Sequence, residues 1–181
     1  MVNESSIFSQ LMANGEFRVD DKGHAILNGQ FLLMIPPPVI LELQEDLENR
    51  YGRKDMEEIM LEAGEFQLEQ ALNRYKDRYD LEEVSRENIL EFFNQVGKVL
   101  GWGDIEIRTE GENPVVTVEY PTLPSVYRNR GEELADRPIC HYLRGMSSKA
   151  VSSLLGEEIT LKEEKCAATG GDICRFEVPK D

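Results

Sequence analysis

The chain has 181 residues, of which 40% are hydrophobic and 30% charged, a composition typical of a globular protein with one sizeable core. Its formal net charge of −15 argues against binding to nucleic acid or to anionic membranes, because both need clustered Lys and Arg. No signal peptide is visible, and the most apolar stretch, Phe31–Ile35, is too short to cross a membrane, so we expect a cytoplasmic protein.

The N-terminal part of the sequence predicts a small β region followed by helices. We expect a lead-in over residues 1–15 and a single domain over residues 16–181. Apolar and polar residues alternate across Glu16–Asn28 about a turn at residues 20–23, which predicts a hairpin, and Phe31–Ile35 predicts a third strand. Apolar residues at helical spacing predict three helices: from the prolines at 36–38 to Gly52, from about Asp55 to Arg78, and from Ser85 to about Leu100.

These helices carry more apolar positions than one narrow buried stripe needs. Large exposed apolar patches are rare in soluble monomers, so surplus faces line a pocket or contact a partner chain. We therefore expect a homodimer, and an apolar cavity between these helices and the strand predicted over Val115–Tyr120. The expected buried stripes are Ile40, Leu43, Leu47 and Tyr51 in the first helix, Met56, Ile59, Met60, Phe66 and Leu72 in the second, and Ile89, Phe92, Phe93 and Val96 in the third.

The C-terminal part predicts strands around one further helix. Alternation at Ile105 and Ile107 and the β-prone run Val115–Tyr120 predict two strands. The remaining expected elements are a loop over Ser125–Glu133, a helix over Asp136–Leu155, a strand over Ile159–Lys165 and a closing strand over Ile173–Val178. Strands and helices are partly segregated along the chain, which predicts an α+β fold with several helices packed on an antiparallel sheet.

The three cysteines of the chain, Cys140, Cys166 and Cys174, are its most informative feature. Thiolates suit zinc, and a closed tetrahedral zinc site takes four ligands, so a carboxylate or a histidine must complete the set. Two other hypotheses are inert thiols in the core and a redox role. A disulfide would pair two cysteines and leave the third alone, which fits neither a secreted framework nor a reducing compartment.

Glu163, Glu164 and His141 are the local candidates for a fourth ligand. Side chains alternate between the two faces of a regular strand, so Glu164 would share a face with Cys166. Glu163 would reach the thiols only if the strand bulges or ends before Cys166. Local geometry alone therefore slightly favours Glu164.

The block Cys140…Glu163-x-x-Cys166…Gly171-Asp-x-Cys174-x-Phe176 resembles the four-vinyl-reductase domain, a small-molecule-binding module. That domain occurs alone in archaeal proteins and as the sensor segment of bacterial phenol- and xylene-responsive activators. The resemblance covers about residues 20–180. It implies a structural zinc ion held by Cys140, Glu163, Cys166 and Cys174, and it selects Glu163 over Glu164.

The resemblance also implies the mixed α/β ligand-binding fold found in NO-signalling proteins and in subunits of the TRAPP vesicle-tethering complex, which is commonly dimeric. The leading functional hypothesis is therefore a zinc-containing module for a hydrophobic or aromatic small molecule, with a sensory or regulatory role. The aromatic residues that we expect to contact the ligand are Phe92, Phe93, Trp102, Tyr120 and Tyr142.

Two other functional classes remain open. An enzyme or enzyme accessory in a reductase pathway would need acid–base or cofactor groups, but the chain has two histidines without visible partners and no GxGxxG fingerprint. We therefore expect no catalysis. A dimeric interaction subunit without a ligand is compatible with the acidic surface and the amphipathic helices. The chain also has no GxxxxGK[ST] loop, so we do not expect a complete activator.

Overall fold

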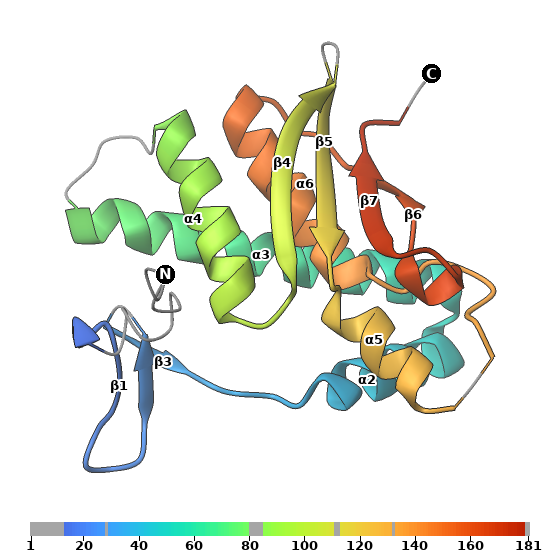
Figure 1. The fold of residues 1–181 in the computed structure, drawn as a ribbon, viewed down its shortest axis with the longest axis horizontal. Coiled ribbons are helices and arrows are strands. Elements are labelled where there is room, and N and C mark those ends of the chain that lie inside the picture. The colour runs from blue at the N-terminus through green and yellow to red at the C-terminus, as the bar shows by residue number, and fades with distance from the viewer. Residues whose placement is uncertain (1–12, 28, 80–84, 111–112, 132, 180–181) are drawn as a thin grey trace, which may run out of the picture. The chain divides into compact units, whose positions relative to one another are not determined.

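The computed structural model describes residues 13–27, 29–79, 85–110, 113–131 and 133–179 (Figure 1). The chain divides into two compact units, Met1–Pro36 and Pro37–Asp181. Helices combine with antiparallel sheets, which confirms the predicted α+β class. Among the described helices, none has both the length and the apolar character that a membrane span needs.

The first unit contains a three-stranded antiparallel sheet, in which β1 (Phe17–Val19) pairs with β2 (Ala25–Leu27) and β2 pairs with β3 (Gln30–Leu32). Asp20 closes the first turn, because its carboxylate accepts hydrogen bonds from the backbone N–H groups of Lys22 and His24 at 3.0 and 2.8 Å. The predicted hairpin and third strand are confirmed, although β3 ends before residues 33–35.

The second unit begins with the three predicted helices. Proline fits the first turn of a helix, where its missing N–H has no partner to lose, and α2 begins at Pro37. Gly52, with a φ of 85°, ends α2 and allows the next helix to start at once. The three helices are α2 (Pro37–Tyr51), α3 (Arg53–Tyr79) and α4 (Arg86–Val99).

A four-stranded antiparallel sheet in the order β4-β5-β7-β6 carries the core of the second unit. Val116, Val118 and Phe176 are fully buried on its inner face, and they form one cluster with Leu143 and Met146 of the last helix. The strands are β4 (Asp104–Glu110), β5 (Asn113–Glu119), β6 (Lys162–Lys165) and β7 (Ile173–Glu177), and the last helix is α6 (His141–Leu155). Figure 1 shows α6 lying along the sheet and α3 crossing it.

Two glycines let α3 and α6 approach at backbone distance. A Cβ atom added to Gly64 would lie 2.0 Å from the Tyr142 carbonyl oxygen, and one added to Gly145 would lie 2.0 Å from the Leu61 carbonyl oxygen. Such contacts cannot be relieved by moving a side chain, because backbone atoms form both surfaces. The glycines therefore set the distance between the helix that precedes the core and the helix that carries it.

Two of the predicted elements near the site are wrong. The predicted loop over Ser125–Glu133 is largely a helix, α5 (Thr122–Asn129), because Leu123 and Pro124 are buried where α5 packs against α2 and the 3₁₀ turn Ala167–Thr169. The predicted helix over Asp136–Leu155 begins later, at His141. Other contacts take up the segment before it: the N–H of Ala135, for example, donates to the Ala168 carbonyl oxygen at 2.9 Å.

The buried face of α2 also differs from the predicted stripe. Leu43 and Tyr51 are 47% and 60% exposed, whereas Leu41 and Gln44 are buried. In α3, Ile59 and Phe66 are exposed in the same way, while the other predicted positions are buried: Met56, Met60 and Leu72. In α4, Ile89 and Phe93 are buried, Phe92 is half-buried, and the side chain of Val96 lies outside the described part.

Candidate metal centre and adjoining pocket

The three thiols and one carboxylate gather in the core of the second unit. Cys140, Glu163, Cys166 and Cys174 are all buried, and their ligand atoms lie within 4.8 Å of one another; we call them the Cys3Glu cluster. Cys140 Sγ lies 4.0 Å from Cys166 Sγ and 3.6 Å from Cys174 Sγ. The cluster joins the residue that precedes α6 to β7 and to the end of β6.

A break in strand register explains how Glu163 reaches the thiols. Glu163 pairs with Phe176, so it shares the inner face of the sheet with Phe176 and, two residues earlier, with Cys174. The pairing then shifts between Glu163 and Lys165, and the strand ends before Cys166. This bulge places Cys166 on the same side as Glu163, as the sequence argument required for a Glu163 ligand.

The other two candidates for a fourth ligand lie outside the cluster. Glu164 is exposed and forms an ion pair with Lys162 at 2.9 Å. His141 is buried and follows Cys140 directly, and burial lowers its pKa to about 4, so the ring is neutral near pH 7. The structure thus brings together the four residues that the family resemblance implied, while metal binding itself stays a prediction.

Hydrogen bonds orient the cluster and leave one oxygen without a protein partner. The backbone N–H of Cys140 donates to Glu163 Oε2 at 3.1 Å, and the N–H of Ala167 donates to Cys174 Sγ at 3.4 Å. Glu163 Oε1 is buried and accepts no hydrogen bond. An unsatisfied buried carboxylate oxygen is costly, so this atom is the one that a cation would stabilise.

The acid–base properties of the cluster indicate a need for positive charge. Burial raises the pKa of Glu163 to about 9, and contact with the Cys166 thiol, together with burial, raises the pKa of Cys140 well above its usual range. Hydrogen bonds from the other two thiols lower the pKa of Cys166. Four acidic groups this close cannot all ionise by themselves, whereas a divalent cation between them would compensate their charge.

The sulfur spacing also fits a tetrahedral ion. Zn–S bonds of about 2.3 Å at tetrahedral angles put the sulfur atoms about 3.8 Å apart. The two measured Sγ–Sγ distances, 3.6 and 4.0 Å, lie on either side of this value. The donor set and its geometry therefore suit a metal ion.

A pocket adjoins the cluster along the chain segment that leads to Cys140. Its volume is about 330 Å³, and it lies between α2, the start of α3, α5 and residues 135–139; we call it the α2 pocket. Half of its lining is apolar or aromatic and half is polar or charged. The lining residues are Leu41, Gln44, Glu45, Glu48, Met56, Tyr127, Ala135, Asp136, Arg137, Pro138, Ile139 and His141.

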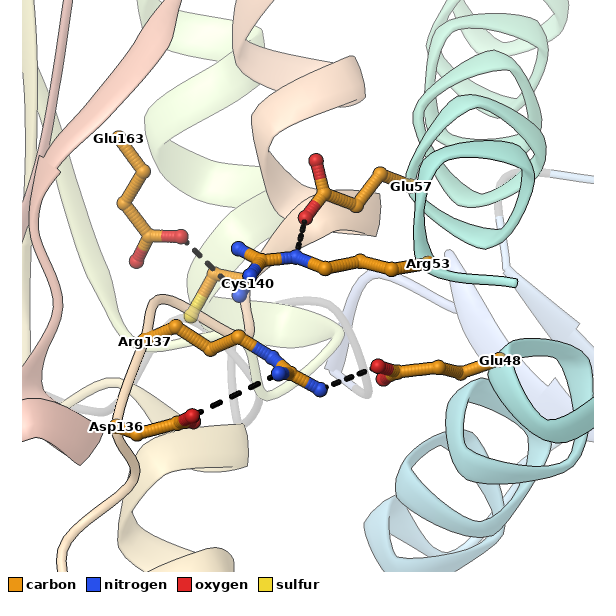
Figure 2. A network of polar contacts seen from close by, with 7 residues as sticks. All are labelled: Glu48, Arg53, Glu57, Asp136, Arg137, Cys140 and Glu163. Carbon is orange, nitrogen blue, oxygen red and sulfur yellow. Dashed lines mark hydrogen bonds and ion pairs between the residues drawn. The ribbon is translucent and has the colours of Figure 1, made fainter.

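Polar contacts hold α2 to the opposite wall of this pocket. The Gln44 amide donates to the Ile139 carbonyl oxygen at 3.2 Å, and Arg137 reaches across to Glu48 (Figure 2). Figure 2 also shows Arg53 paired with Glu57 on α3, at 2.6 Å. The segment over residues 135–139 is therefore fixed between α2 on one side and the Cys3Glu cluster at its end.

Residues 116–180 match the family model of the vinyl-4-reductase (4VR) domain, and they include all four members of the Cys3Glu cluster. This segment is a 4VR domain. The match confirms the resemblance to the four-vinyl-reductase family that the cysteine spacing indicated.

Solved structures show the same fold as the chain that carries this 4VR domain. The phenol-responsive sensory domain of the transcription activator PoxR, determined with phenol, is 18% identical and superposes with a TM-score of 0.73, over 97% of this chain and 91% of the other. An H-NOX protein from S. oneidensis is 12% identical with a TM-score of 0.50, over 96% and 88%. A vinyl-4-reductase family protein from Methanocaldococcus jannaschii is 18% identical over 84% and 99%, but its TM-score of 0.41 carries no argument. Comparison with curated proteins gives no match.

The structure does not bring the five predicted ligand-contacting aromatic residues into the α2 pocket. Trp102 stacks on Tyr142 with ring centroids 5.4 Å apart, Phe92 packs edge-on against Tyr75, and Phe93 is fully buried in the core. Tyr120 is 80% exposed. Ligand contact by these residues stays a prediction, and so does the apolar cavity between the helices and the strand that follows Val115.

The residues that do line a pocket near the 4VR cluster were largely missed from the sequence. Gln44 and Glu48 are polar positions on a helix whose buried face was assigned to other residues, and Arg137 was assigned to the first turn of a helix. One signal was available. Leu41, Gln44 and Glu48 follow the spacing i, i+3 and i+7, so they share one face of α2.

Proposed function

We propose that the chain is a zinc-containing binding module for a hydrophobic or aromatic small molecule, with a sensory or regulatory role in the cytoplasm. The observation that supports it most is the α2 pocket next to the Cys3Glu cluster. Its volume of about 330 Å³ falls in the range of small-molecule sites, roughly 300–1,000 Å³. The fold likeness to the phenol-responsive domain of PoxR supports the same class of ligand.

The donor set supports zinc as the metal. Three thiolates and one carboxylate form a soft site that suits zinc better than calcium or magnesium, which prefer oxygen ligands. Four protein ligands leave no open position for water, so the zinc would stabilise the fold rather than take part in catalysis. It would join the elements of the 4VR domain at Cys140, Cys166 and Cys174, which are far apart in sequence but adjacent in the core.

The metal proposal makes a prediction about two neighbouring glutamates. Glu163→Gln is expected to weaken zinc binding about 10-fold or more, because the amide replaces the charged oxygen of a buried ligand. Glu164→Gln is the matched control and should bind like the wild type, since Glu164 is exposed and paired with Lys162. Competition with a coloured chelator measures both affinities, after metal analysis has shown about one zinc per wild-type chain. Equal affinities for the two variants would exclude Glu163 as a ligand.

The small-molecule proposal predicts ligand-dependent stability. A ligand that binds only the folded protein raises its free energy of unfolding by about 1.4 kcal/mol for each tenfold excess over the Kd. Thermal-shift measurements with phenols, alkylbenzenes, fatty acids and isoprenoid fragments should therefore find at least one class that raises Tm in proportion to the logarithm of its concentration. The absence of a shift in all four classes would contradict the binding proposal and leave the interaction-subunit hypothesis.

The proposed homodimer would cover apolar side chains that the second unit leaves exposed. Leu43 and Phe66 are 47% and 64% exposed, and Ile59 and Tyr51 are also exposed. Burying such residues against a second copy would remove their apolar surface from water. Light scattering on the purified protein is expected to give twice the chain mass of 20.7 kDa, and Leu43→Glu together with Phe66→Glu to give the monomer mass. A monomeric wild type would refute the dimer.

A further inference from the structure

The α2 pocket contains a buried hydrogen-bond acceptor that no protein group satisfies. Gln44 is 6% exposed, and its Oε1 atom has no hydrogen-bond partner. The orientation of the amide is fixed, because its Nε2 atom donates to the Ile139 carbonyl oxygen, which can only accept. The free position on Gln44 is therefore an acceptor, in the wall of the pocket between α2 and the segment that leads to Cys140.

The charges around the pocket have a definite sign. Three carboxylates, Glu45, Glu48 and Asp136, line it against one guanidinium, Arg137, an excess of two negative charges. Arg130 lies at the rim and pairs with Glu45 and with Glu42, both at 3.3 Å, so these two rim groups leave the excess unchanged. Arg137 itself is occupied by Glu48 and Asp136. An anionic ligand would meet like charge without an available cation in the lining.

We infer that the α2 pocket selects neutral or cationic aromatic molecules that carry a hydroxyl or amino hydrogen-bond donor, and that Gln44 Oε1 accepts that hydrogen bond. The apolar part of the ligand would contact Leu41, Met56, Tyr127 and Ile139. This inference rests on the proposed small-molecule function and specifies its ligand class. Discrimination follows from the unpaired acceptor: a ligand with a donor satisfies it, whereas an ether or hydrocarbon of the same shape leaves it unsatisfied.

Four probes of one shape test the inference, namely 4-ethylphenol, 4-ethylaniline, 4-ethylanisole and 4-ethylbenzoate. Calorimetric titration of the zinc-loaded wild-type protein is expected to show the phenol and the aniline binding on the order of 10-fold more tightly than the ether. The carboxylate is expected to bind most weakly. In Gln44→Met, which keeps the length of the side chain and removes the acceptor, the phenol and the ether should bind with equal affinity, close to that of the ether in the wild type.

Different failures are distinguishable in this experiment. If the probes bind but the wild type does not prefer the phenol to the ether, or if Gln44→Met keeps that preference, the role of Gln44 is overturned and the proposed binding function stands. If the carboxylate binds best, the charge argument is overturned. If none of the probes binds, the inference falls together with the proposed function. Should Gln44→Met fail to fold, the ranking of the four probes on the wild type decides alone.

Discussion

Replacing Cys174 with serine is expected to abolish stoichiometric zinc binding and to lower the free energy of unfolding by about 3 kcal/mol or more, a fall of roughly 10 °C in Tm. Cys174 is fully buried on β7, and its Sγ lies 3.6 Å from that of Cys140. Metal binding stabilises only the folded chain, because the unfolded chain does not hold the four ligands together. Differential scanning calorimetry and metal analysis on the same samples measure both effects.

The control for this substitution separates the metal from the packing change. The Tm of the wild type should fall when a chelator removes zinc and recover when zinc is returned, whereas the Tm of Cys174→Ser should respond to neither treatment. A serine variant that keeps both its zinc and its Tm would show that Cys174 is an ordinary core residue. A wild type that binds zinc without any change in Tm would refute the structural role of the metal.

Gly145→Ala is expected to be strongly destabilising, by about 3 kcal/mol or more, although alanine is the better helix former by about 1 kcal/mol. The added Cβ would lie 2.0 Å from the Leu61 carbonyl oxygen and 3.0 Å from the Glu65 backbone nitrogen, so α3 and α6 would have to separate. Their separation would loosen the core on both sides of the helix that carries Leu143 and Met146. Urea unfolding with a fixed slope measures the difference from the wild type.

Gly97→Ala is the matched control for this prediction, because it places the same methyl group in another helix. Its Cβ would meet Cδ1 and Cγ1 of Ile105 at 2.4 and 2.8 Å, which are side-chain atoms that can rotate away. A smaller loss of stability is therefore expected for Gly97→Ala than for Gly145→Ala. Equal losses in the two variants would show that the α3–α6 contact adapts more easily than its backbone distances indicate.

The periodicity of the sequence predicted the elements, and the cysteines predicted the cluster. Prolines, glycines and apolar spacing gave the order of strands and helices in both units, because these signals act within a few residues. The thiols could be grouped because three cysteines in a chain without other thiols suggest one site. Choosing Glu163 over Glu164 needed the family resemblance, since a bulge in β6 has no clear local signal in Lys162–Lys165.

The pocket could not be predicted because tertiary contacts decide which face of α2 is buried. Leu43 and Tyr51 give the stronger hydrophobic pattern, yet Leu41 and Gln44 face inward. Gln44 is held there by the Ile139 carbonyl oxygen, which lies 95 residues further along the chain. The helix predicted to start at Asp136 fails for a similar reason, because Arg137 pairs with Glu48 of α2 instead of continuing a helical turn.

The segment over residues 135–139 makes the two sites thermodynamically dependent on each other. It forms one wall of the α2 pocket, and the next residue, Cys140, belongs to the Cys3Glu cluster. A molecule that favours one arrangement of this segment changes the free energy of occupying the other site, and linkage makes the effect equal in both directions. If metal occupancy tightens the pocket by some factor, an occupied pocket must slow the net loss of metal to the same equilibrium extent. The availability of metal would then set the threshold at which the protein responds to its small molecule.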